Sequence, residues 1–441
     1  MILFSMRPHS LIMLAGLLLP GLSRADLVTD SNHTLMQLVR DFSTGAVPAS
    51  RNFAILQTSI FDAVNGVDPR YQSYRVAAAA AAGSSPQAAA AAAAHSVLTA
   101  LYPSRAATFD ATYSAQLSAL PAGAPRDNGA AWGQLVATNI LNWRAGDNAS
   151  ASVNYVSGSQ PGNWRPAAPD FGPPDSPQWP DVTPWTLTTG SQFRPTTGPP
   201  QLNSAAYTAA YTDVFSLGSA TGSTRTNGQT DSALFWSYNP GSQTAVGHWN
   251  SIASAVVAGK ANTLVDNARI FAALNTALAD AAIVTSDAAY TSDFWRPITA
   301  IHEAATDGNL NTSPLTEWEP LVDTPGSPEY ISGNAVFAGA ASSVLNYLIG
   351  TETSFTISSD RVATAMNFYG SFDDAAEDAT VAGIYGGTQF RNSASQGLAT
   401  GHLVGSRVSA NYFQPALVPE PGAASLILLA GLVATRRRAY R

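Results

Sequence analysis

The 441-residue chain contains no cysteine and only one lysine, Lys260. Without cysteine it forms no disulfide bond, has no thiolate ligand for a metal and has no nucleophilic thiol. Charged residues make up only 12% of the chain, whereas hydrophobic residues make up 45%. Disordered chains have little hydrophobic content and much charge, so this composition predicts a folded protein instead.

The few charges are mostly acidic, and the net charge is −8. Loss of the six arginines in the two end segments described below takes this value to −14. An acidic protein repels the phosphates of nucleic acids and does not attract anionic substrates over long distances. Nucleic acid is therefore not an expected partner.

The first 25 residues have the parts of a secretory signal peptide. Arg7 supplies a positive charge, and an apolar run follows at residues 11–22. Ser23 and Ala25 are the small residues expected before a cleavage site, so we predict cleavage before Asp26. The alternative is an N-terminal transmembrane anchor, but a membrane span needs ~20 apolar residues.

The last residues form a second unit, 418–441. Val418-Pro419-Glu420-Pro421 precedes an apolar stretch at residues 423–434, and the arginines at 436–438 and 441 follow. This order resembles the PEP-CTERM sorting signal of Gram-negative bacteria. The resemblance implies transient membrane anchoring, processing by an exosortase-type enzyme and final location at the cell surface or outside the cell. It also associates the protein with extracellular polysaccharide. An ordinary C-terminal anchor is the alternative.

The body between these ends has the apolar spacing of helices. Apolar residues recur three and four positions apart in several segments, and few segments alternate with a period of two. Ser50 and Ser204 stand where N-caps are expected. Ser332 and Gly333 precede another such segment, which we expect to begin a helix near Ala335. The body is therefore predicted to be mainly α-helical.

A proline-rich segment, residues 161–203, divides the body into helical parts at 26–160 and 204–415. Its prolines exclude a helix. Trp164, Trp179 and Trp185 make it too aromatic for a solvated linker. We therefore predict an ordered loop that packs over helices sharing one core.

Three further segments carry a resemblance that covers nearly the whole body. They are residues 286–301, which contain Arg296-Pro297, residues 328–334, which contain Ser332-Gly333, and residues 383–391. Their order and spacing resemble the bacterial vanadium-dependent haloperoxidases, in the superfamily of the type 2 phosphatidic acid phosphatases. The resemblance implies a helical bundle, an oxyanion pocket for vanadate or phosphate, and possible assembly as a homodimer.

In that family a lysine, two arginines, a serine and a glycine bind the oxyanion. One histidine is an acid/base, and another bonds the metal or attacks phosphorus. Arg296, Ser332 and Gly333 remain here as an anion-binding remnant. The four other positions hold different residues: Ala289 for the lysine, Asn334 for the acid/base histidine, Gly383 for the second arginine and Gln389 for the ligand histidine.

These replacements remove the chemistry that the resemblance implies. An amide such as Gln389 has no nitrogen lone pair with which to act as an imidazole. His302, six residues after Arg296, is a possible substitute, and Lys260 is the only lysine in the chain. The remaining histidines of the body have no metal-ligand spacing, so no metal and no cofactor are predicted. Arg296 is expected either to retain anion binding or to pair with Asp287 or Asp293.

The sequence thus leaves two hypotheses open. In the first, the protein is an exported relative of the haloperoxidases with an inactive oxyanion pocket, and it acts as a surface or matrix scaffold or binding protein. In the second, it is an active haloperoxidase or acid-phosphatase-type enzyme with an altered site, and vanadate is then its cofactor.

Overall fold

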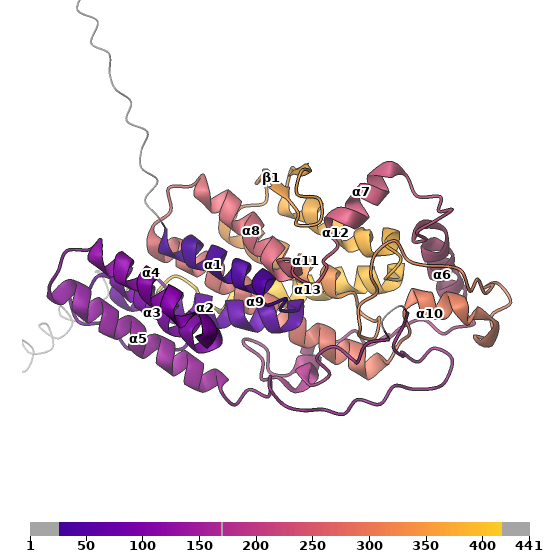
Figure 1. Ribbon diagram of the computed structural model, residues 1–441, viewed down its shortest axis with the longest axis horizontal. Helices are drawn as coiled ribbons and strands as arrows, with labels where there is room; N and C mark the ends of the chain where they lie inside the picture. Colours follow the sequence, from indigo (N-terminus) through magenta and orange to yellow (C-terminus); the bar gives the residue numbers. More distant parts are fainter. Residues whose placement is uncertain (1–25, 169–170, 417–441) are drawn as a thin grey trace, which may run out of the picture.

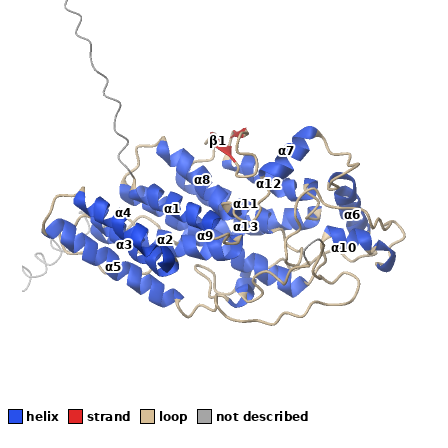
Figure 2. Cartoon of the chain, in the orientation of Figure 1, coloured by secondary structure: helices blue, strands red, loops and turns tan. Residues whose placement is uncertain are grey.

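The computed structural model describes residues 26–168 and 171–416 (Figure 1). The predicted signal peptide, residues 1–25, and the predicted sorting tail, residues 418–441, lie outside the described residues. The described part is almost entirely helical, as Figure 2 shows. The prediction of a mainly α-helical fold is confirmed.

The described residues form thirteen α-helices. Their bounds are α1 Leu27–Asp41, α2 Ala46–Val67, α3 Pro86–Leu101, α4 Ala106–Ser118, α5 Ala124–Arg144, α6 Ala205–Leu217, α7 Asn227–Phe235, α8 Thr244–Ala258, α9 Leu264–Ser292, α10 Pro297–His302, α11 Gly333–Ile349, α12 Phe372–Tyr385 and α13 Arg391–Asn411. Two short antiparallel strands, β1 Phe355–Ser358 and β2 Met366–Tyr369, pair with Phe355 opposite Tyr369. This hairpin was not predicted, because four residues per strand are too few to show a clear alternation.

Side-chain caps explain where some helices begin. The Ser204 hydroxyl accepts a hydrogen bond from the N–H of Tyr207 at 3.1 Å, as the predicted cap of α6. The prediction that Ser50 caps a helix is wrong. Helix α2 begins four residues earlier, at Ala46, and the Ser50 hydroxyl donates to the carbonyl of Val47 at 2.7 Å. Pro48 does not prevent this earlier start, because N–H groups in the first turn have no acceptor within the helix.

Helix α9 lies at the centre of the fold, where α2 and α11 pack against it. Among the described helices it alone is long and apolar enough to cross a membrane, yet 89% of its most apolar window is buried inside the protein. Buried residues from both helical parts join it in one hydrophobic cluster. The two parts flanking the proline-rich loop therefore share a core.

Helices α11 and α13 pack with their backbones in direct proximity. Gly397, Gly401 and Gly405 recur every four residues and therefore lie on one face of α13. A Cβ atom at these positions would lie 2.3–2.7 Å from carbonyl oxygens of Ser332 and of α11. Any side chain there would push the helices apart, so the glycines hold α11 at a fixed distance.

The proline-rich loop packs over the helices, as predicted. Trp164, Trp179 and Trp185 are all buried. Asp280, a buried residue of α9, accepts hydrogen bonds from the N–H groups of Trp185 at 2.7 Å and Thr186 at 2.8 Å. It also accepts one from the Thr186 hydroxyl at 2.5 Å. The Asp280 carboxylate thus binds the loop to the central helix through three hydrogen bonds.

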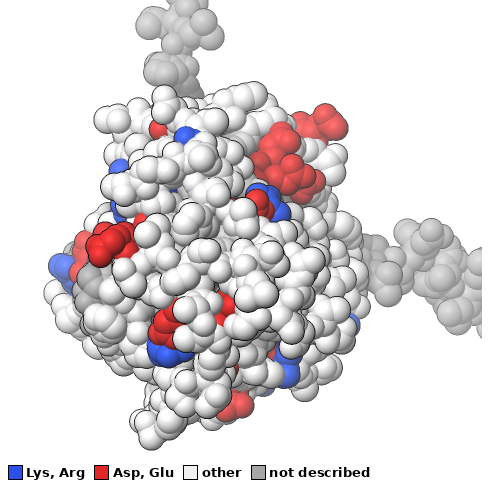
Figure 3. Space-filling model, turned by 90° about the vertical axis from the view of Figure 1, so that its right-hand side faces the viewer, with Lys and Arg blue, Asp and Glu red and all other residues white. Residues whose placement is uncertain are grey.

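Charged side chains are sparse on the face shown in Figure 3. Several arginines in the described part of the chain are paired with aspartates: Arg40 with Asp360 at 2.9 Å, Arg194 with Asp287 at 2.6 Å and Arg391 with Asp213 at 2.5 Å. These pairs leave those guanidinium groups largely neutralised.

Candidate ligand-binding site

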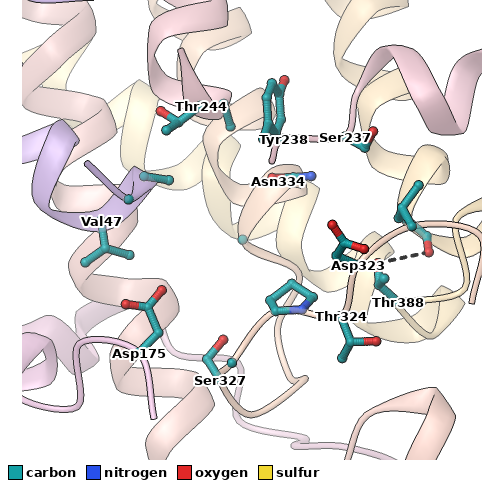
Figure 4. Close-up of a pocket in the computed structure, with 18 of the residues that line it drawn as sticks. Val47, Asp175, Ser237, Tyr238, Thr244, Asp323, Thr324, Ser327, Asn334 and Thr388 are labelled. Carbon is teal, nitrogen blue, oxygen red and sulfur yellow. Dashed lines mark hydrogen bonds between the residues drawn. The ribbon is translucent and has the colours of Figure 1, made fainter. Parts of the chain in front are cut away.

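A cavity of about 530 Å³ lies beside α8, α9 and the N-terminus of α11, and Figure 4 shows part of its lining. This volume is typical of pockets for small molecules. The cavity occupies the place where the resemblance puts an oxyanion pocket. Its lining includes six of the seven residues singled out for that pocket: Ala289, Arg296, Gly333, Asn334, Gly383 and Gln389.

Four elements place these residues around one space. Ala289 lies in the last turn of α9, and Arg296 directly precedes α10. Gly333 and Asn334 begin α11. Gly383 lies in the last turn of α12, and Gln389 follows that helix. The segments therefore converge as the resemblance implies, although four of the side chains differ.

Arg296 is buried, and protein oxygen atoms surround its guanidinium group. Nε donates to the carbonyl of Ser327 at 2.7 Å, and Nη1 donates to the carbonyl of Thr388 at 3.2 Å. Nη2 donates to the hydroxyl of Ser327 at 2.9 Å and to the carbonyl of Pro328 at 3.2 Å. Burial lowers the pKa of Arg296 to about 10, although Glu329 nearby favours the charged form.

The expected pairing of Arg296 with Asp287 or Asp293 is wrong. Asp287 accepts two hydrogen bonds from Arg194, and Asp293 accepts one from Tyr155. Both carboxylates are therefore engaged by partners from the proline-rich loop and the segment before it. Arg296 is held mainly by backbone carbonyls of two loops instead, an arrangement that residue spacing does not reveal.

Gln389 joins Arg296 to Glu329. We orient its amide by the hydrogen-bond network, so that the oxygen accepts from Nη1 of Arg296 at 3.0 Å. The amide nitrogen then donates to Glu329 Oε1 at 3.3 Å and to the Ser332 hydroxyl at 3.2 Å. With this bond, all five N–H groups of Arg296 have protein acceptors.

Gly383 also has a packing relation to Gln389. A Cβ atom at residue 383 would lie 2.6 Å from Cγ of Gln389. The glutamine side chain therefore occupies space that a larger residue at 383 needs. An arginine at residue 383 would therefore collide with the Gln389 side chain in its present position.

The N-terminus of α11 supplies backbone donors to the cavity. The Ser332 hydroxyl caps this helix by accepting from the N–H of Ala335 at 3.4 Å, which confirms the predicted start. Gly333 and Asn334 occupy the first two helical positions, where N–H groups have no acceptor within the helix. No described residue accepts from either N–H group. They add a weak positive potential at this end of the cavity.

Neither candidate replacement for the missing cations reaches the cavity. His302 Nε2 pairs with the carbonyl oxygen of Trp318 at 2.8 Å, and His302 does not line the cavity. Lys260 is exposed just beyond the C-terminal end of α8. Within residues 26–168 and 171–416, no histidine or lysine lines the cavity, and Arg296 is the only arginine that does.

These residues do not fit a vanadate or phosphate site. An oxyanion needs several cations or N–H donors, and in the family that the sequence resembles a histidine bonds the vanadate. Here the one guanidinium group has no N–H left, and residue 389 is an amide. The described residues also hold no group of three acidic or histidine side chains that suits a metal cation.

Two features of the site were missed by sequence reasoning. Glu329 is buried, and its Oε1 accepts from the N–H of Phe390 at 2.8 Å, while Oε2 has no partner among the described residues. Thr244 lines the cavity with a positive φ of 65°, which is uncommon for a β-branched residue. The position of Glu329 shortly before Ser332-Gly333 is a sequence signal that could have pointed to it. No sequence signal indicates the positive φ of Thr244.

Burial raises the pKa of Glu329 to about 7, against 4.5 for an ordinary glutamate. Between pH 4.5 and 7 the Glu329 carboxyl group is therefore protonated in the folded state and ionised in the unfolded state. The free energy of unfolding falls as the pH rises through this range. Relative to Glu329→Gln, we expect the natural protein to lose about 3 kcal/mol of unfolding free energy between pH 4.5 and 7.

Urea denaturation of both proteins at several pH values measures this difference. Other buried acids, such as Asp62 and Asp280, titrate equally in both proteins and cancel. Curves of stability against pH that run parallel for the two proteins would contradict the prediction.

Comparison with known proteins agrees with this fold. Residues 269–415, from α9 through α13, match the family model described as the VCPO second helical-bundle domain. A bacterial vanadium-dependent iodoperoxidase superposes with a TM-score of 0.77 at 24% identity, over 88% of this chain and 96% of that one. The chain therefore has the helical-bundle fold of the vanadium haloperoxidases, and its C-terminal part carries that family's second bundle.

Two further structures extend the comparison. The apo and holo forms of a bacterial vanadium-dependent chloroperoxidase have TM-scores of 0.65 and 0.63 and identities of 14% and 15%. Each match covers 83% of this chain, and 93% and 92% of the respective structures. No curated protein sequence matches the chain. The predicted resemblance to the vanadium haloperoxidases is confirmed.

Proposed function

We propose that this protein is an exported, vanadium-haloperoxidase-like binding protein whose cavity takes neither vanadate nor phosphate. The observation that carries the proposal is the state of Arg296, whose five N–H groups all have protein acceptors. An oxyanion would have to displace a carbonyl or the Gln389 amide to reach this guanidinium group. The protein then acts through binding at a cell surface or in a matrix.

Calorimetric titration of the purified protein with orthovanadate and with phosphate tests this proposal. We expect no heat of binding at micromolar ligand, because the described lining offers no further cation and no imidazole. The second hypothesis, an active haloperoxidase or acid-phosphatase-type enzyme, requires such binding. Micromolar vanadate affinity would reject the proposal, and a bromide-oxidation assay would follow.

Export is part of the proposal and rests on the two end segments. Asp26, the first residue after the predicted cleavage site, caps α1 by accepting from the N–H of Val28 at 3.1 Å. Cleavage before Asp26 would therefore leave this helix cap in place. Mass spectrometry of the secreted protein should find Asp26 at the N-terminus and should show whether an exosortase-type enzyme has removed the tail.

A further inference from the structure

Uncharged polar side chains form a large part of the cavity lining. They include hydroxyls of Ser237, Ser286, Ser327, Thr244, Thr285, Thr324 and Thr388 and amides of Asn239, Asn334 and Gln389. Three of the threonines, Thr244, Thr285 and Thr324, have buried hydroxyl oxygens with no partner among the described residues. Buried hydroxyls are normally hydrogen-bonded, so these three are candidates to bind a ligand.

Donors and acceptors lie at different parts of this lining. The N–H groups of Gly333 and Asn334 and the buried Arg296 lie where the loops meet α11. Asp175 and Asp323 are exposed lining residues, and Figure 4 shows both carboxylates. The N–H of Asp175 donates to the carbonyl of Gly326 at 2.7 Å, so two loops join at this exposed side. The cavity therefore combines inner donors with acidic acceptors at its mouth.

This distribution disfavours a charged ligand of either sign. An anion meets Asp175 and Asp323 at the mouth and finds no N–H of Arg296 available. A cation meets the buried guanidinium and the positive end of α11. A hydroxyl group can donate to the carboxylates and accept from the inner N–H groups, so a neutral ligand with many hydroxyls suits both parts.

Aromatic rings complete the lining. Trp236, Tyr238 and Tyr290 all line the cavity. The Tyr290 hydroxyl donates to the carbonyl of Asp175, and the Tyr238 hydroxyl pairs with Nδ1 of His248 at 3.0 Å. Their hydroxyls are therefore engaged within the protein, and their apolar ring surface is what they offer to a ligand. Sugar rings have an apolar C–H face that packs on such surfaces.

From these observations we infer that the cavity binds a neutral saccharide. The inference rests on the proposed function, because it requires that no oxyanion occupies the same space. Thr244 and Asn334 are assigned as hydrogen-bonding residues, since both line the cavity and the Thr244 hydroxyl has no protein partner. Asp175 and Asp323 bind hydroxyl groups at the mouth.

A glycan array carrying neutral, uronate-containing, sulfated and free-amine saccharides tests the ligand class with the full chain. We expect the neutral set to be retained, and the best neutral saccharide then serves as the probe for calorimetry. Each lost hydrogen bond contributes about 0.5–1.5 kcal/mol, so Thr244→Val and Asn334→Leu should each weaken binding by up to about tenfold. Thr99→Val removes an unpartnered hydroxyl outside this cavity and should bind normally.

Thr244→Val is nearly isosteric and provides a readout if Asn334→Leu fails to fold. Retention of no saccharide, or of acidic saccharides alone, would overturn the inference. So would unchanged affinity in both cavity variants. A parallel vanadate titration separates the two proposals: vanadate binding rejects the proposed function and the inference with it, whereas absence of both ligands rejects the inference alone.

Discussion

Restoring the family's charged residues should create the vanadate binding that, under the proposed function, the natural protein lacks. The variant combines Ala289→Lys, Asn334→His, Gly383→Arg and Gln389→His. Each charge-assisted hydrogen bond contributes about 1.5–3 kcal/mol, so two added cations should strengthen binding by roughly 10²–10⁴-fold. Replacing Gln389 also releases one N–H of Arg296, although the histidine keeps the Cβ and Cγ atoms that lie close to residue 383, so this pair must repack together.

Calorimetry with orthovanadate measures this effect, and a neutral variant of similar bulk is the control. That control carries Ala289→Met, Gly383→Gln and Gln389→Leu and keeps the natural Asn334, so that residues 383 and 389 must repack in both variants. It should bind no vanadate. If the charged variant folds, as judged by circular dichroism, and still binds no more tightly than the control, then the cavity differs from a haloperoxidase site in more than these side chains.

Asp280→Ala should lower the unfolding free energy by about 3–5 kcal/mol. The substitution leaves the N–H groups of Trp185 and Thr186 and the Thr186 hydroxyl without their acceptor. Each buried unsatisfied donor costs about 1–3 kcal/mol, and partial relaxation of the loop reduces the sum. Chemical denaturation at pH 5 measures the loss, because burial raises the pKa of Asp280 to about 6 and at higher pH the ionised carboxylate is itself disfavoured in the folded state, which makes the loss smaller.

Asp280→Asn serves as the matched control for this prediction. The asparagine keeps one acceptor oxygen, so its loss of stability should be smaller than that of the alanine variant. Limited proteolysis should also cut the loop at residues 161–203 sooner in Asp280→Ala than in the natural protein. Equal stability of the alanine variant and the natural protein would show that the buried tryptophans hold the loop without the carboxylate.

The positions of the cavity residues were predictable, but their bonding was not. The spacing of the motifs predicted that Ala289, Asn334 and Gln389 surround one pocket, because chains that share a family's motif order and spacing also share the packing of its helices. The same spacing left the partners of Arg296 open between carboxylates and anions. Its actual partners are carbonyls of loops before α11 and after α12, and backbone orientation in loops leaves no trace in residue identity.

Burial explains the other sequence-based errors and omissions. Glu329 looks like a surface residue in the sequence, and only the packing of the segment before α11 makes it a buried acid with a raised pKa. His302 follows Arg296 by less than two helical turns, yet it pairs with Trp318 because α10 ends there. Arg296 directly precedes α10 and His302 is the last residue of that helix, so the two side chains lie at opposite ends of α10 and have different surroundings.

The glycine contacts between α11 and α13 fix the position of α11 independently of the side chains that line the cavity. Because backbone meets backbone there, the distance that positions Gly333 and Asn334 does not depend on which side chains line the cavity. The lining side chains can consequently change over evolution, or by design, while the backbone of α11 keeps its position. Single substitutions in the lining can therefore alter the binding specificity of this fold.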